Sequence, residues 1–443
     1  MTLGSMCQLK AGLEDLPRAM AFVETAGRHH AMAVDAVRKL QLAAEEVITA
    51  LDPGTDLEFA VAAGADRTRL TITCHGRGMD LAAFNLAWRP DPETMDTGLG
   101  LALASRYVDA FALEADAGGR LVLQFGVDTP YDGSVTPPPP AAPWRFYRLI
   151  RPTPQTIMAA GKHLYHRALA AKGNPRAMHP DRLAALTAGD ALFGTLAEAD
   201  DGRIVGCCFC IPRDRRLLDG FGPFVFTEQE RRRMARDLAC HTLERVARKP
   251  YSGVLTTRYD GDCFPAEFFI PARRPTAGPT GGGGAATGTT VWHFPLADDA
   301  GGPLHYHVAA EPFIREAATL QDLPRQMIRL SDADLAAVTG DGASVFSTAL
   351  DRGERAAMLH LLMPGTDLAA NADAHLAFFA QEEIALCRFF LDLGRPGDAA
   401  LIPVLVERGF APCLLLPGGG RGDLLVLERL SDASACGVAQ GGA

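Results

Sequence analysis

A glycine pair followed by a helix is the feature of this chain that points most directly to chemistry. Gly98 and Gly100 follow Thr97 and open an amphipathic, alanine-rich helical pattern. Glycines at the start of a helix bare backbone N–H groups, so the oxygens of a phosphate group are readily bound there. A glycine pair alone is weak evidence, because glycines are also typical of ordinary turns and caps. The stretch predicts a phosphate-binding loop if other parts of a nucleotide site accompany it.

Two such parts lie upstream. Glu46 belongs to a helical pattern over residues 31–51, in which position 50 shares its face. A carboxylate placed there could position water and Mg²⁺ beside a triphosphate. Further along, a strand pattern ends in a turn with Gly76 and Gly78, where a planar base can approach the backbone closely. The order and spacing of the three pieces favour a nucleotide site over three unrelated turns.

Together these pieces resemble the GHKL ATPase fold, and most closely the bacterial anti-sigma-factor serine kinases. That family has an Asn box, a D-x-G-x-G adenine box and a G-x-G phosphate box. Gly76 and Gly78 match the adenine box. Gly98 and Gly100 match the phosphate box, and Glu46 matches the glutamate that opens the Asn box. The resemblance covers about residues 10–128 and implies a helix–sheet sandwich that binds ATP and Mg²⁺.

Two residues that the family uses to hold ATP are replaced. The Asn position is Ala50, so the amide that would hold Mg²⁺ is absent. The aspartate that reads the adenine amino group falls on Cys74. Losing that charged acceptor weakens base recognition by about 1.5–3 kcal/mol. We therefore expect weakened ATP/Mg²⁺ binding, with Glu46 as the catalytic carboxylate if a serine kinase activity survives.

The resemblance also implies a regulatory setting. A protein partner of the sigma-factor or anti-anti-sigma type is expected, and a homodimer is left open. The net charge of −10 argues against nucleic acid or an acidic membrane surface as the main partner. The sequence shows no signal peptide and no membrane-spanning apolar run, which favours the cytoplasm. The ten cysteines lack metal-ligand spacing, so no metal site is predicted.

The downstream half carries a second resemblance. A strand pattern, a turn at 200–202 and a strand with Val205 and Gly206 resemble the central hairpin of GNAT acyltransferases, although two ordinary core strands explain them equally well. In that family the second strand presents its backbone to the pantetheine arm of acyl-CoA. Residues 387–430 resemble the closing half of the same fold.

The phosphate-binding part of that second site departs from the family. A glycine-bearing pyrophosphate loop should open the next helix, but residues 227–234 contain no glycine. They carry Glu228 and Glu230, whose carboxylates would repel phosphates. The sequence thus argues against acetyl-CoA as a cofactor of this segment without excluding it. An acyl-CoA-dependent N-acyltransferase regulated by the N-terminal domain is the alternative function.

Two composition breaks divide the chain. Four prolines at 137–140 predict a stiff linker at 136–143, and a glycine run predicts a flexible linker at 274–290. The expected parts are a histidine-kinase-like ATPase domain at 1–135, GNAT-like segments at 144–273 and 291–430, and a tail at 431–443. Helix and strand patterns mix in each, so the expected fold class is α/β (α+β), a helix–sheet sandwich followed by one or two mixed domains.

Overall fold

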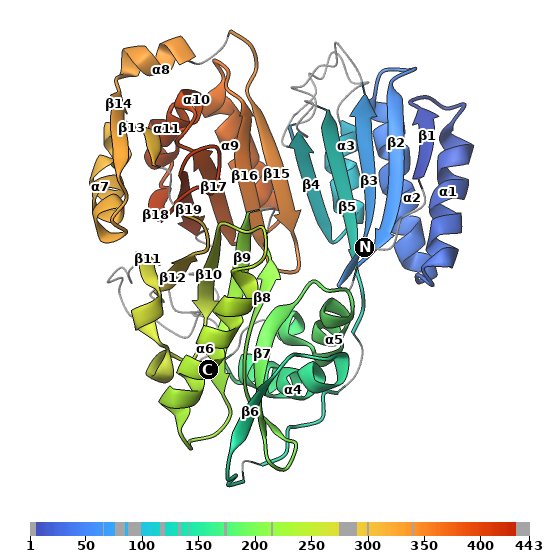
Figure 1. The fold of residues 1–443 in the computed structure, drawn as a ribbon. Helices are drawn as coiled ribbons and strands as arrows, with labels where there is room; N and C mark the ends of the chain where they lie inside the picture. Colours follow the sequence, from blue (N-terminus) through green and yellow to red (C-terminus); the bar gives the residue numbers. More distant parts are fainter. Residues whose placement is uncertain are drawn as a thin grey trace, which may run out of the picture.

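The computed structural model describes residues 6–64, 66–75, 85–86, 99–115, 120–131, 134–140, 142–171, 175–213, 216–273, 290–298, 301–338 and 341–430. These residues form a mixed α/β structure with a ten-stranded, a seven-stranded and a two-stranded sheet (Figure 1). The fold class expected from the sequence is confirmed. Among the described residues, none of the helices is both long and apolar enough to cross a bilayer.

The N-terminal part is a two-layer sandwich. Its antiparallel strands follow the order β1 (Met6–Lys10), β2 (Asp56–Ala63), β3 (Arg67–His75), β5 (Leu121–Asp128), β4 (Ala110–Ala115). Its helices are α1 (Leu16–His29), α2 (Val34–Ala50) and α3 (Leu99–Tyr107) (Figure 1).

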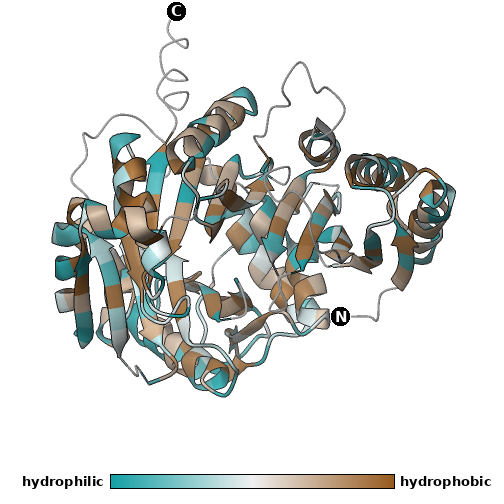
Figure 2. Cartoon of the chain, turned by 90° about the horizontal axis from the view of Figure 1, so that it is seen from above, coloured by the Kyte–Doolittle hydropathy of each residue, from teal (hydrophilic) through white to brown (hydrophobic). Residues whose placement is uncertain are grey.

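The sequence of α2 explains why this sandwich forms. Its buried residues fall at the i, i+3, i+4, i+7 and i+8 spacing of one helix face: Leu40, Ala43, Ala44, Val47 and Ile48. They share a core with alternate residues of the strands, which point to the same side of the sheet. Viewed from above, hydrophobic and hydrophilic residues are interspersed along the helices and strands of the chain (Figure 2).

The sheet of the sandwich continues into the C-terminal part. β15 (Val345–Asp351) pairs antiparallel with β4, so β4 is paired on both sides. The next strands are β16 (Ala356–Met363), β17 (Leu386–Asp392), β19 (Leu424–Leu430) and β18 (Ala411–Leu416). β16 and β17 run parallel, and their connection contains α9 (Leu368–Gln381). The last helices are α10 (Pro396–Ala399) and α11 (Leu401–Glu407).

The middle part has its own seven-stranded sheet. Its strands in spatial order are β11 (Ile270–Arg273), β12 (Val291–Pro295), β10 (Gly253–Arg258), β9 (Leu217–Val225), β8 (Ile204–Pro212), β7 (Phe193–Ala199) and β6 (Tyr147–Ile150). Its helices are α4 (Pro154–Ala170), α5 (Pro180–Ala188) and α6 (Arg231–Val246). Cys207 packs in the core with α4 and α5, whereas Cys208 and Cys210 pack in cores with α6. The three cysteines are buried core thiols.

The position of β12 shows that the expected segment boundary at residue 291 does not coincide with the boundary between the two large sheets. The sequence placed residues 291–295 at the start of the last segment. In the structure they pair with β10 and β11, in the sheet of the middle part. Strand partners are set by non-local contacts, so a break in composition does not reveal them.

The remaining elements span residues 302–338, between β12 of the seven-stranded sheet and β15 of the ten-stranded sheet. β13 (Gly302–His307) and β14 (Arg325–Leu330) form a parallel pair, α7 (Glu311–Leu320) connects them, and α8 (Asp332–Val338) follows. Single 3-10 turns occur at η2 (Arg176–Met178), η3 (Gly261–Cys263), η4 (Ala266–Phe268) and η5 (Val308–Ala310). His305 contacts the Leu393 carbonyl and His307 the Asp332 carboxylate. The two imidazoles therefore have separate partners.

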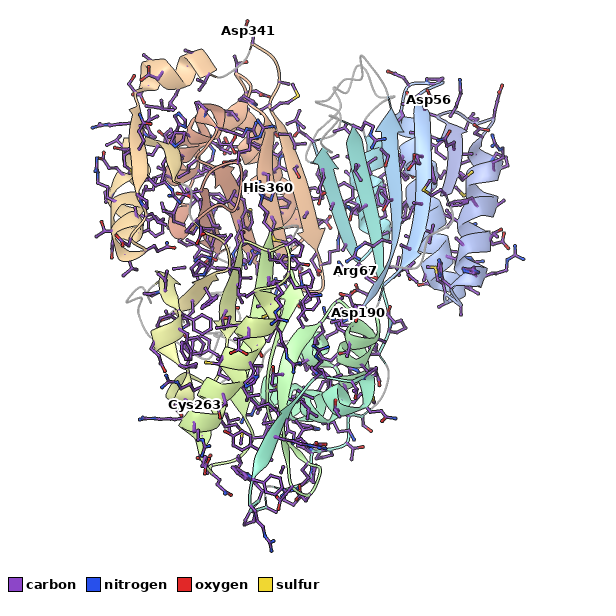
Figure 3. All side chains as sticks on the ribbon, in the orientation of Figure 1. Asp56, Arg67, Asp190, Cys263, Asp341 and His360 are labelled. Atoms are coloured by element: carbon purple, nitrogen blue, oxygen red, sulfur yellow. The ribbon has the colours of Figure 1, made fainter. Side chains whose placement is uncertain are left out.

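Several side-chain contacts tie the N-terminal sandwich to the rest, and those of Arg67 and Asn85 are among them. Arg67 donates to Asp128 at 2.6 Å within the sandwich and to Asp351 of β15 at 2.9 Å. Figure 3 shows Arg67 at the end of the N-terminal sheet that faces the middle part. Asn85 donates to the Ser344 carbonyl at 2.8 Å and accepts the Phe346 N–H at 3.0 Å. Asn85 is 7% exposed, so these bonds are shielded from water.

Asp398 of α10 makes the stability of the C-terminal part depend on pH. It is 2% exposed and accepts the Asp392 N–H at 2.9 Å. Burial raises the pKa of its carboxyl from 3.8 to about 7. The folded state therefore binds the proton more tightly than the unfolded chain, and this stabilisation is lost as the pH rises from about 4 to 7.

We expect Asp398→Asn to raise the free energy of unfolding, because the amide needs no ionisation. The gain should be about 2–3 kcal/mol larger at pH 8 than at pH 5. Urea unfolding at the two pH values measures it. Asp373→Asn, at an exposed carboxylate paired with Arg408, is the control and should give no gain at pH 8. Equal gains from Asp398→Asn at both pH values would refute this assignment.

Candidate functional site

The expected nucleotide site is only partly within the described structure. Gly76, Gly78, Thr97 and Gly98 lie outside the described residues, so their roles stay predictions. Gly100 lies in the first turn of α3, and its role in phosphate binding also stays a prediction. Glu46, Ala50 and Cys74 are described and can be examined directly.

Glu46 and Ala50 lie one turn apart on α2, which packs against α3. Both are half-buried. Partial burial, helped by the neighbouring Glu45 carboxylate, raises the pKa of the Glu46 carboxyl. A raised pKa suits a general base, but no hydrogen bond or ion pair orients Glu46 within the described residues. Ala50 presents only a methyl group beside it.

Cys74 is part of the hydrophobic core. It lies near the end of β3, opposite Leu57 and Leu121, and is fully buried at 0% exposure. Burial raises the pKa of its thiol to about 12, so the thiol is neutral at physiological pH. A neutral thiol is a weak hydrogen-bond donor and acceptor and cannot replace a carboxylate. The position aligned with the adenine-reading aspartate is therefore apolar.

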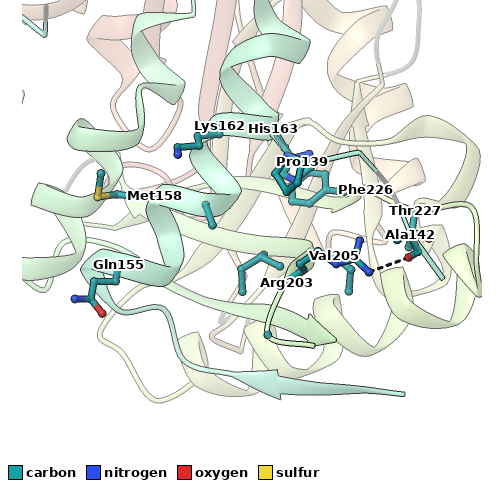
Figure 4. A pocket seen from close by; sticks show the side chains of 13 residues that line it. Pro139, Ala142, Gln155, Met158, Lys162, His163, Arg203, Val205, Phe226 and Thr227 are labelled. Atoms are coloured by element: carbon teal, nitrogen blue, oxygen red, sulfur yellow. Dashed lines mark hydrogen bonds between the residues drawn. The ribbon is translucent and has the colours of Figure 1, made fainter. Parts of the chain in front are cut away.

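A cavity of about 450 Å³ in the middle part is the second candidate (Figure 4). Its walls are one face of α4, the start of β8 with the preceding turn, and residues 226–227 at the end of β9. The segment that follows the N-terminal sandwich also reaches it, through Pro139 and Ala142. A volume of this size suits a drug-sized ligand.

Three basic side chains line this cavity. Arg203 donates to the Asp201 carboxylate at 2.5 Å and to the Ala142 carbonyl at 3.0 Å. His163 stacks on Phe226 with ring centroids 4.2 Å apart and an angle of 6° between the rings. Burial, together with the charge of the nearby Arg167, lowers the pKa of His163 to about 4. Lys162 is half-buried and makes no hydrogen bond or ion pair within the described residues.

The strand ends beside the cavity have few free backbone groups. β8, which the sequence analysis expected to present its backbone to pantetheine, pairs with β7 on one side and β9 on the other. At the end of β9, the Val225 N–H is accepted by Asp260 at 2.9 Å. The Val225 carbonyl accepts from Arg167 at 2.7 Å. A pantetheine arm would have to displace these bonds to lie along the backbone here.

The start of α6 repels phosphate less than its sequence suggests. Glu228 pairs with Arg231 at 3.3 Å, and Glu230 pairs with Arg233 at 3.2 Å. Their negative charges are therefore largely balanced locally. No side chain of a described residue caps the helix, which begins at Arg231. Its first N–H groups keep their potential to attract an anion.

The sequence analysis pointed to the turn at 200–202 and to Val205, which line the cavity, but not to the cavity residues of α4. Gln155, Ala159 and Lys162 share one face of α4 through i+4 and i+7 spacing, which a helical pattern can show. The opposite walls come from segments about forty and sixty residues away, so no local signal marks a shared pocket.

The comparisons with known proteins are sparse. No protein-family model matches the chain, and no curated protein matches it significantly. Among solved structures, a GNAT-family N-acetyltransferase from Escherichia coli in complex with CoA is 15% identical, with 43% of this chain and 93% of that chain covered and a TM-score of 0.26. A GNAT-superfamily phosphinothricin acetyltransferase from Sinorhizobium meliloti in complex with acetyl-CoA is 13% identical, with coverages of 34% and 90% and a TM-score of 0.28.

Both matched structures are described as members of the family that the sequence analysis expects for segments 144–273 and 291–430. TM-scores this low carry no weight for an activity or a ligand. The comparisons give no support to the ATPase resemblance of the N-terminal part, which stays a prediction.

Proposed function

We propose that the chain is a bacterial signalling regulator whose N-terminal sandwich is a degenerate ATP-binding domain of the anti-sigma serine-kinase type. The sandwich acts mainly by binding a regulatory protein, either a sigma factor or an anti-anti-sigma type protein. The GNAT-like region binds a ligand or a further partner. The observation that carries the proposal is Cys74, a neutral thiol in the core at the position of the adenine-reading carboxylate.

Features around Cys74 support this choice. Ala50 supplies no oxygen ligand for Mg²⁺ next to Glu46, so a bound triphosphate would be poorly held. The sandwich shares a sheet with the C-terminal part, and Asn85 is bonded to that part as well. Packed, hydrogen-bonded connections of this kind can carry coupling between a partner-binding domain and a ligand-binding one.

The alternative is an acyl-CoA-dependent N-acyltransferase regulated by the N-terminal part. It is favoured by the ion pairs of Glu228 and Glu230, which reduce the repulsion of phosphates at the start of α6. It is opposed by the bonds of Asp260 and Arg167 to the backbone of Val225. Weak acetyl-CoA binding is compatible with both observations.

Calorimetry on the full chain tests the proposal. The chain is titrated with purified sigma factors and anti-anti-sigma type proteins of its own genome, with and without ATP/Mg²⁺. We expect one of them to bind with an affinity that ATP does not change. Thermal shift with ATP/Mg²⁺, ADP and acetyl-CoA runs in parallel, because a ligand at 100 times its Kd stabilises the fold by about 2.7 kcal/mol.

The outcomes of these two measurements separate the functions. Partner binding without stabilisation by ATP agrees with the proposal. Stabilisation by acetyl-CoA together with acetyl transfer to an amine establishes the alternative instead. Binding of none of the candidate proteins overturns the regulatory assignment.

A further inference from the structure

We propose that the α4 cavity binds an amphipathic monocarboxylate, with its carboxylate at Lys162 and its apolar chain against the cavity walls. The inference rests on the proposed function, because it names the ligand class of the ligand-binding region. It follows from the charge, the lining and the backbone environment of the cavity.

The charge of the lining selects an anion. No carboxylate side chain lines the cavity among the described residues. Arg203 is balanced by Asp201, and His163 is uncharged at neutral pH. Lys162 thus supplies the one formal charge in the lining that lacks a partner within the described part of the chain. Because a half-buried ammonium has lost part of its hydration, a ligand anion that forms a hydrogen bond to it would stabilise the complex.

The rest of the lining selects an apolar body. Met158 and Ala159 on α4 face the same cavity as Ile204 and Val205 on β8. Figure 4 shows Met158 and Lys162 projecting from the same helix, with Val205 on the strand below. Burying an alkyl chain against such side chains stabilises a complex by about 0.8 kcal/mol per CH₂ group. A purely polar anion would leave these apolar side chains exposed to water.

The donors available favour a carboxylate over a phosphate. Phosphate sites usually combine several cations with bare backbone N–H groups or an arginine fork. Here the guanidinium of Arg203 already bonds to Asp201 and Ala142. A single ammonium balances the charge of a carboxylate, whereas a phosphate dianion would keep an unbalanced negative charge in the partly buried site. The ligand would also touch Pro139 and Ala142, on the segment that leads back to the N-terminal sandwich.

Calorimetry with sodium octanoate on the full chain tests this inference. Octanoate should bind, octylammonium should not, and octyl phosphate should bind more weakly than octanoate. Lys162→Met, which keeps most of the length of the side chain but removes its charge, should weaken octanoate binding by about ten- to hundredfold. Lys10→Met, at an exposed position of β1, is the matched control and should leave the affinity unchanged.

A second variant keeps the test valid if Lys162→Met fails to fold. Ala159→Phe fills the cavity from the helix side and should abolish octanoate binding with an unchanged circular dichroism spectrum. No octanoate binding to the wild-type chain, or equal affinities for Lys162→Met and Lys10→Met, overturns the inference. Tighter binding of octyl phosphate than of octanoate also overturns it. ATP-independent partner binding would stand in each of these cases, so failure of the inference is distinguishable from failure of the proposed function.

Discussion

Replacing Arg325 by methionine should lower the free energy of unfolding by about 3–5 kcal/mol. Arg325 at the start of β14 forms two parallel bonds to Asp423, 2.6 and 2.9 Å long. The two side chains are only 4% and 2% exposed. Asp423 also accepts the Gly418 N–H at 3.1 Å, which closes the tip of the β18–β19 hairpin. Removing the guanidinium leaves a carboxylate buried without its counter-charge.

Denaturant unfolding of a small set of variants measures this effect. Asp423→Asn should destabilise the fold by a similar amount, because it leaves the buried guanidinium without its charge partner. The double variant Arg325→Met/Asp423→Leu should regain part of the loss, since it removes both charges together. Arg315→Met, at an exposed arginine of α7, is the control and should leave the denaturation midpoint nearly unchanged. Equal midpoint shifts for Arg325→Met and Arg315→Met would contradict the prediction.

The same hairpin shows what the sequence could and could not indicate. The glycines and charges at 418–423 are typical of a hairpin tip, and β18 and β19 flank them. The partner of Asp423 lies about a hundred residues earlier in the chain. A turn signal is local, whereas the pairing of two buried charges is decided by tertiary packing.

Elements with strong local patterns were predicted well. The apolar runs at 204–212 and 356–363 are typical of buried strands, and β8 and β16 have these bounds. Proline is typical of the first turn of a helix, and α4 begins at Pro154. β14 and β15 were not predicted, although β15 joins the two halves of the largest sheet. Its short run, Val345–Asp351, mixes Ser and Thr with apolar residues and gives no clear periodicity. The joining of β4 to β15 spans more than two hundred residues, which no window along the sequence samples.

The residues of the candidate sites also differ in whether a local sequence pattern or only the structure identifies them. Glu46, Ala50 and Cys74 were identified because a motif fixes their positions in one contiguous stretch of chain. Their surroundings required the structure: the sequence alone did not show that the Cys74 thiol lies in the core. Lys162 and Arg203 carry no motif, and they become a candidate site only because α4 packs over the start of β8.

Cys74→Asp should lower the free energy of unfolding by about 3–5 kcal/mol at pH 7. Cys74 has 0% exposure and hydrophobic residues around it, so an ionised carboxylate there would lack both water and a counter-charge. Burial would raise the pKa of the new carboxyl above its unfolded value. The destabilisation should therefore grow as the pH rises from about 4, and below that pH it should fall to the smaller cost of burying a neutral carboxyl group. Cys74→Ser, which is polar but uncharged, is the control and should show no such pH dependence.

Combining Cys74→Asp with Ala50→Asn also tests whether the sandwich has the architecture of an ATP-binding domain. In Ala50→Asn/Cys74→Asp the chain regains both the amide for Mg²⁺ and the acceptor for the adenine amino group. If the sandwich keeps the architecture of an anti-sigma-type ATPase, ATP/Mg²⁺ supplies the partner that the buried carboxylate lacks. Thermal shift should then show a larger rise in Tm with ATP for the double variant than for the wild-type chain. A double variant that is destabilised to the same extent with and without ATP would show that the sandwich shares only the order of its elements with that family.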